Sequence, residues 1–148
     1  HIDNFRKNSL RRNLFSYLKR KNITTIVATH DSTDVLSFAD EVLVMQHGKI
    51  LAENTPRALY NTPGSKYVAS LFGDVNEVPG HYFDQSQMLL LFPHQLQKVE
   101  ESGLKAIVTN AYFRGNHFLV EADYPDGVLF FEHASQLERG SVVFLGQK

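Results

Sequence analysis

The first regular pattern along the chain is a set of apolar residues that repeats with the period of an α-helix. These side chains recur at i, i+4, i+7 and i+8, namely at Leu10, Leu14, Tyr17 and Leu18. The spacing places them on one side of a helix, so we predict a helix over residues 4–21 that packs against a sheet. Lysines and arginines cover its other faces. These basic residues could form a surface that binds nucleic acid or a membrane, or simply a helix face exposed to water. We expect the solvated face.

A short continuous apolar run follows this predicted helix. Residues 23–28 show no polar alternation apart from two threonines, which favours a strand covered on both sides in a parallel sheet. A helix then begins, with Asp31 or Ser32 as N-cap and Asp34 in a capping-box-like position. His30 is therefore predicted at a strand-to-helix turn. Because α/β sheets bind ligands at the carboxyl ends of their strands, His30 is a candidate for a ligand site.

Short elements are predicted from there to residue 73. Two strands, 42–45 and 49–52, flank the turn sequence QHG. Thr55, which a proline follows, is expected to cap a short helix. A last helix over 66–72 should end at Gly73, a residue type that suits the position after a helix. Helix and strand alternate in this half, so its predicted class is α/β.

The second half has the two-residue period of strands. HFLVEADY places Phe118, Val120, Ala122 and Tyr124 on one face. Four further segments, QMLLLF, LKAIVTNAYF, VLFFE and VVFLG, also read as strands, whereas residues 94–101 are predicted to be helical or irregular. Hairpin turns are expected at RGN (114–116) and YPDGV (124–128). Five short strands must close on one another to avoid exposed edges, which indicates a small all-β OB-like barrel.

Charge divides the chain at the same place. Residues 1–73 hold ten Lys/Arg against six Asp/Glu, and residues 74–148 hold five against ten, so the halves carry +4 and −5 within a net charge of −1. The change falls in the polar stretch that begins at Gly73 and contains glycine and proline. We therefore predict a first domain at 1–73, a linker at 74–86 and a second domain at 87–148.

Composition excludes several classes of site. The chain has 43% hydrophobic and 21% charged residues, as soluble globular proteins do, and no stretch approaches the roughly 20 apolar residues that span a bilayer. There is no cysteine, so disulfides and thiolate metal sites are excluded. No histidines are paired at i, i+2 or i, i+4, and we predict no metal site. No signal peptide is recognisable.

Two other functions remain as alternatives. An OB-like barrel suits a binding module for a small ligand or for single-stranded nucleic acid, with stacking residues at Tyr112, Phe113, Phe118 and Phe130. The charge of −5 argues against nucleic acid, because such binders present a positive groove. A self-contained hydrolase using His30 and Asp31 is disfavoured because no nucleophile motif such as G-x-S-x-G is present.

The run ITTIVATHDSTDVLSFADEVLVMQHGKILAENTPRALYNTPGSKYVASLFG resembles a known family. It is similar to the C-terminal third of the nucleotide-binding domain of ABC importers, the P-loop ATPases that energise uptake of sugars, iron, polyamines or oxyanions. The resemblance extends from Ile2 to Gly73. It implies that His30 is the switch histidine that hydrogen-bonds the ATP γ-phosphate. It also implies that Ile2 and Asp3 belong to the end of the D-loop, which faces the partner subunit across the dimer, with Asp3 as a cofactor-binding residue. Ser32 and Thr33 depart from the family, which commonly has Gln and Glu there.

The resemblance also implies cofactors and partners for the intact protein. These are ATP, Mg²⁺, a second ATP-binding subunit and transmembrane permease subunits, with a cytoplasmic location at the inner face of the membrane. The sequence contains no G-x-x-x-x-G-K-[ST] phosphate loop. We therefore expect this chain to be the C-terminal portion of such an ATPase, and to be inactive alone. FPHQLQKV, AYFRGNHFLVEA and ERGSVVFLGQK resemble the TOBE-type regulatory barrel that follows the ATPase domain in these importers.

Overall fold

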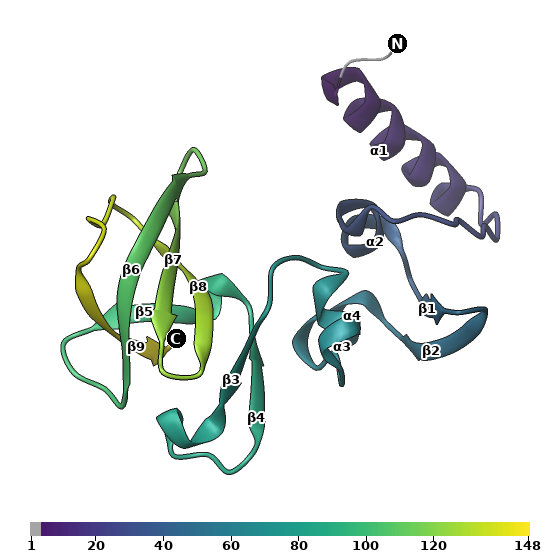
Figure 1. Cartoon of the computed structure of the whole chain (residues 1–148). Coiled ribbons are helices and arrows are strands. Elements are labelled where there is room, and N and C mark those ends of the chain that lie inside the picture. Colours follow the sequence, from purple (N-terminus) through teal and green to yellow (C-terminus); the bar gives the residue numbers. More distant parts are fainter. Residues whose placement is uncertain (1–3) are drawn as a thin grey trace.

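The computed structural model describes residues 4–148, which form a helical part followed by a strand-rich part (Figure 1). The N-terminal part, residues 4–72, contains four helices and one hairpin. In chain order its elements are α1 (Asn4–Arg20), α2 (Ser32–Phe38), β1 (Val42–Gln46), β2 (Lys49–Asn54), α3 (Pro56–Asn61) and α4 (Lys66–Ser70). The β part, residues 76–148, contains β3 to β9 and two short 3₁₀ helices. The fold is thus mixed, with helices near the N-terminus and an antiparallel β structure after them.

Helix α1 forms where its periodicity predicts, but it does not pack against a sheet. It has no buried residue, and Leu10, Leu14 and Tyr17 are about half exposed, at 58%, 50% and 48%. Helix α1 instead contacts α2 through Phe15, whose ring stacks on that of Phe38 with 4.6 Å between the centroids. The expected packing of the apolar stripe is therefore wrong for the described residues, because no strand lies beneath that face.

The strand predicted at 23–28 is also wrong. Residues 22–30 have no regular secondary structure, and Ile26 is 96% exposed. A strand is stabilised by backbone hydrogen bonds to a neighbouring strand, and none of the strands within residues 4–148 pairs with this segment. A parallel sheet is likewise absent from this part of the chain, since all pairings in the described residues are antiparallel.

The short elements that follow agree well with their local signals. Strands β1 and β2 form an antiparallel hairpin across His47 and Gly48, which both have positive φ, 50° and 72°. This is the conformation of a tight hairpin turn. The Thr55 hydroxyl accepts a hydrogen bond from the backbone N–H of Ala58 and caps α3 as predicted. Helix α4 ends at Ser70, two residues before the predicted end. Val44, Leu59 and Val68 form the small buried cluster of this part.

The β part consists of a two-stranded and a five-stranded antiparallel sheet. The first pairs β3 (Asn76–Pro79) with β4 (Met88–Leu91). The second has the order β5-β9-β6-β7-β8, and its strands are β5 (Leu96–Val99), β6 (Leu104–Phe113), β7 (Phe118–Tyr124), β8 (Gly127–His133) and β9 (Val142–Gln147). The five segments predicted as strands all contain strands. The first of them, however, pairs with β3, and the fifth strand of the large sheet is β5, in a stretch predicted to be helical or irregular.

Residues 76–83 lie in the stretch expected to be a linker, and they form β3 and the 3₁₀ helix η1 (Gly80–Phe83). Val78 of β3 is fully buried in the main hydrophobic core. The other large members of this core come from β5 to β9, among them Leu96, Leu104, Val120, Phe131 and Leu145. The edge strands β5 and β8 contact each other, so the sheet curls around this core (Figure 1). Curling of this kind limits exposed sheet edges.

Candidate functional site

His30 lies at the point where the irregular segment 22–30 meets helix α2. Its side chain is exposed. Among residues 4–148 it has no hydrogen-bond or ion-pair partner. The segment before it is not the predicted strand, but the helix after it begins as predicted, at Ser32 with Asp31 as its N-cap. His30 therefore presents, directly before a capped helix start, an exposed imidazole that no other described residue contacts through a hydrogen bond or ion pair.

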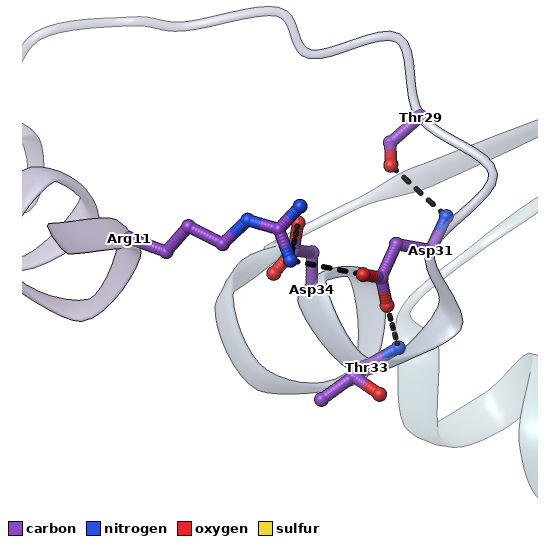
Figure 2. A network of polar contacts seen from close by, with 5 residues as sticks. All are labelled: Arg11, Thr29, Asp31, Thr33 and Asp34. Carbon is purple, nitrogen blue, oxygen red and sulfur yellow. Dashed lines mark hydrogen bonds and ion pairs between the residues drawn. The ribbon is translucent and has the colours of Figure 1, made fainter. Parts of the chain in front are cut away.

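Asp31 holds the turn in which His30 lies. Its Oδ1 accepts a hydrogen bond from the backbone N–H of Thr33 at 3.0 Å, and its own N–H donates to Oγ1 of Thr29 at 3.0 Å. Figure 2 shows both bonds, with the backbone between Thr29 and Thr33 turning sharply around the aspartate. The two residues adjacent to His30 in the sequence are thus both fixed by local hydrogen bonds.

Arg11 of α1 links this turn to the preceding helix. Its Nη1 donates to Oδ2 of Asp31 at 2.9 Å and lies 3.3 Å from Oδ2 of Asp34 (Figure 2). The hydrogen bond from Arg11, with that from the Thr33 N–H, holds the pKa of Asp31 below its ordinary value. At neutral pH the carboxylate is therefore charged and available both to Arg11 and to the helix start. A second ion pair, Lys19 to Asp40 at 3.0 Å, joins α1 to the segment that follows α2.

This role of Arg11 was not predicted from the sequence. The basic residues of 4–21 were expected to form a solvated face, and Arg11 instead ties α1 to the turn twenty residues later. No local pattern indicates such a pair, because its partners come together only when α1 folds back toward α2. The other predicted site residue, Asp3, lies outside the described residues.

The site offers one kind of chemistry. An exposed imidazole can donate or accept a single hydrogen bond to a ligand oxygen, and the turn around Asp31 limits where that imidazole can lie. Within residues 4–148 there is no group of three His, Asp or Glu side chains placed to hold a metal ion. In the same range, no helix combines the length and the apolar character needed to cross a membrane.

Comparison with known proteins gives relatives of one kind. An iron(III) import ATP-binding protein, FbpC, of Photobacterium profundum is 36% identical over 84 residues, which are 57% of this chain and 24% of that protein. A sulfate/thiosulfate import ATP-binding protein, CysA, of Chromobacterium violaceum is 40% identical over 73 residues, 49% of this chain and 20% of its own length. The alignment to FbpC of Escherichia coli O157:H7 covers more of this chain, 79%, at 29% identity and 34% of the relative.

These alignments span only about a fifth to a third of each relative. The alignment to the spermidine/putrescine import ATP-binding protein PotA of Ureaplasma parvum covers 86% of this chain, so it includes the β part, at 24% identity. No protein-family model matches the chain. The resemblance predicted from the sequence is nevertheless confirmed by the relatives: the chain is homologous to part of the ATP-binding subunits of ABC importers.

Proposed function

We propose that this chain is the C-terminal portion of the ATP-hydrolysing subunit of an ABC importer, in which His30 is the switch histidine. The observation that carries the proposal is the position of His30. It is an exposed imidazole without an intramolecular partner in the described residues, directly before the capped start of α2. Homology to importer ATP-binding subunits supports the same assignment.

In this function His30 hydrogen-bonds the γ-phosphate of ATP. Phosphoryl transfer is catalysed mainly by positioning and by stabilisation of charge on the phosphate oxygens, and the imidazole contributes to both. Asp31 and Arg11 act through His30, since they hold the turn that orients it. They are positioning residues. Asp3 is assigned to the D-loop end of the same nucleotide site.

Other parts of the subunit supply most of the nucleotide binding in this proposal. The sequence has no G-x-x-x-x-G-K-[ST] loop, and the described residues hold no carboxylate cluster at His30 that suits Mg²⁺. The phosphates and Mg²⁺ are therefore held by residues other than these, and this chain is inactive alone. The partners are a second ATP-binding subunit and transmembrane permease subunits, and the location is cytoplasmic at the inner face of the membrane.

We assign the β part to a regulatory barrel of the TOBE and OB-like type. Its five-stranded sheet curls around one core, as a small barrel requires. The nucleic-acid alternative is disfavoured by its surface. The hydroxyl of Tyr112, a proposed stacking residue, donates to the Glu121 carboxylate at 2.9 Å, so a negative charge lies where phosphates would have to approach.

The test is a comparison of ATP turnover with ATP affinity in the intact subunit. Replacing His30 with alanine should remove one contact to the transferred phosphate. By analogy with loss of an oxyanion-hole donor, the rate should fall about a hundred- to a thousandfold, or roughly 2.7–4 kcal/mol of transition-state stabilisation. Affinity for ATP should change far less, because the phosphate loop carries it.

His47→Asn is the matched control. His47 is also exposed and lies in the β1–β2 turn, and asparagine tolerates its positive φ of 50°. This variant should keep the parent rate. If His30→Ala hydrolyses ATP within about threefold of the parent, well short of the loss expected for such a contact, the assigned role of His30 is wrong.

A further inference from the structure

The N-terminal part and the β part are joined by a stack of aromatic rings. Tyr60 of α3 lies parallel to Phe92, with ring centroids 4.7 Å apart and 13° between the planes. Phe72 packs edge-on against the same tyrosine at 5.8 Å. His94 lies nearly parallel to Phe92 at 5.8 Å, and its Nε2 is 3.5 Å from the Tyr60 hydroxyl. Tyr60 thus contacts side chains on both sides of residue 73.

Each side of this stack is anchored in a separate hydrophobic core. Leu59, next to Tyr60, is 4% exposed and belongs to the small cluster of the N-terminal part. Leu91, next to Phe92, belongs to the main core of the β part. Phe92 itself is 5% exposed, and its N–H donates to the Gln95 side chain at 2.8 Å. The rings therefore connect two cores whose own packing holds them in place.

The chain segment that links the two parts does not by itself fix their relative orientation. It runs through Gly73 and Asp74, which are both exposed, and Gly73 has φ of 154°. A glycine at such a position leaves the chain free to adopt many conformations. An ion pair between Lys66 and Glu77 at 3.4 Å also crosses the junction, but both side chains are well exposed and such pairs contribute little.

We propose that Tyr60 is a latch that fixes the orientation of the β part relative to α3 and α4. A cleft of about 290 Å³ lies beside the latch, and its walls come from both parts. On one side they include Tyr60 and Phe72, and on the other His94, Arg114 and Glu132. Burial, and the negative charge of Glu132, raise the pKa of Tyr60, so its hydroxyl stays protonated near neutral pH. Opening the latch separates the walls of this cleft.

This inference goes beyond the assignment of His30 and does not depend on it. It concerns whether a displacement of α3 also displaces the β part, and it is independent of which ligand causes the displacement. A rigid junction transmits such a movement, whereas a flexible one absorbs it. Tyr60 is a positioning residue in this arrangement and touches no reacting group.

Distance measurement between two spin labels tests the latch. The chain has no cysteine, so Lys49→Cys in β2 and Lys105→Cys in β6, both exposed positions, take nitroxide labels uniquely. Double electron–electron resonance is then recorded on labelled chain diluted with unlabelled chain, which suppresses distances between molecules. The labelled parent and Tyr60→Phe should give one narrow distance distribution.

Tyr60→Ala should broaden this distribution about twofold or more, because the two parts then reorient about residue 73. Tyr60→Leu, which keeps apolar volume beside Leu59, should do the same. Tyr112→Ala removes a tyrosine that is about half exposed and whose hydroxyl donates to Glu121 within the β part, so it should leave the distribution narrow. The proposal is overturned if the labelled parent is already broad, if both Tyr60→Ala and Tyr60→Leu stay narrow, or if Tyr112→Ala broadens it equally. Loss of the β fold in both Tyr60 variants, seen by circular dichroism, also overturns it, since Tyr60 would then be required for folding rather than for orientation.

Discussion

Replacing Asn76 with alanine should destabilise the β part more than any other polar substitution in the stretch first predicted to be a linker. Asn76 is 4% exposed, and its side-chain amide makes two hydrogen bonds to one residue of β8. Its Nδ2 donates to the carbonyl oxygen of Phe130, and its Oδ1 accepts from the N–H of Phe130, each at 2.7 Å. Since β8 is an edge strand, the amide takes the place of a neighbouring strand at that position.

The expected cost follows from the two backbone groups that alanine would leave without partners. A buried donor or acceptor without a hydrogen bond costs about 1–3 kcal/mol. Phe130 is only half-buried, so water reaches its backbone in part, and we expect the lower half of the range for two groups, about 2–4 kcal/mol. Asn76→Asp should be at least as harmful at neutral pH, because it turns a carboxylate toward the Phe130 carbonyl. Acidification should restore part of its stability by supplying the missing donor.

Amide hydrogen exchange in β6 and β7 measures the effect in the full chain, since these central strands open only with the β part. Asn110→Ala is the control. Asn110 is exposed, and its side chain makes a single hydrogen bond to Glu121 at 3.3 Å. Asn110→Ala should therefore change the free energy of unfolding by no more than about 0.5 kcal/mol. A cost below about 1 kcal/mol for Asn76→Ala, or a cost equal to that of Asn110→Ala, would refute the assignment of Asn76 as an edge partner.

Three further outcomes are expected. Calorimetric titration of the 148-residue chain with ATP and Mg²⁺ should show no tight binding, because His30 alone cannot replace a phosphate loop, and submicromolar affinity would contradict this. The chain should self-associate through exposed apolar side chains of the N-terminal part, such as Leu10, Ile26 and Met45. Residues 74–148 alone should stay monomeric. If light scattering shows that the full chain is a monomer, the expected self-association is wrong. The hydrogen bond to Asp126 raises the pKa of Tyr82 to about 12, so ultraviolet titration should show a late-ionising tyrosine that Tyr82→Phe removes. Since the pKa is raised in the fold, this contribution to stability is present below pH 10 and is lost as pH rises toward 12. A titration unchanged in Tyr82→Phe would disprove it.

Features that depend on neighbours in the sequence were predictable. The N-caps at Asp31 and Thr55, the tight turn at His47 and Gly48, and the alternation in β7 each express a local preference of a few residues. Such preferences act whatever surrounds the segment. For this reason the start of the helix that follows His30 could be placed from the sequence.

Strands and contacts that join residues far apart in the sequence were decided only by the tertiary structure. Residues 23–28 have the composition of a strand, but a strand requires a neighbour for its backbone groups, and the described residues offer none there. Strands β3 and β5 carry weak local signals and form because β4 and β9 pair with them. The same holds for the contacts of Arg11 with Asp31, Tyr60 with Phe92 and Asn76 with Phe130. Each joins residues at least twenty positions apart, so its energy appears only once the chain has brought them together.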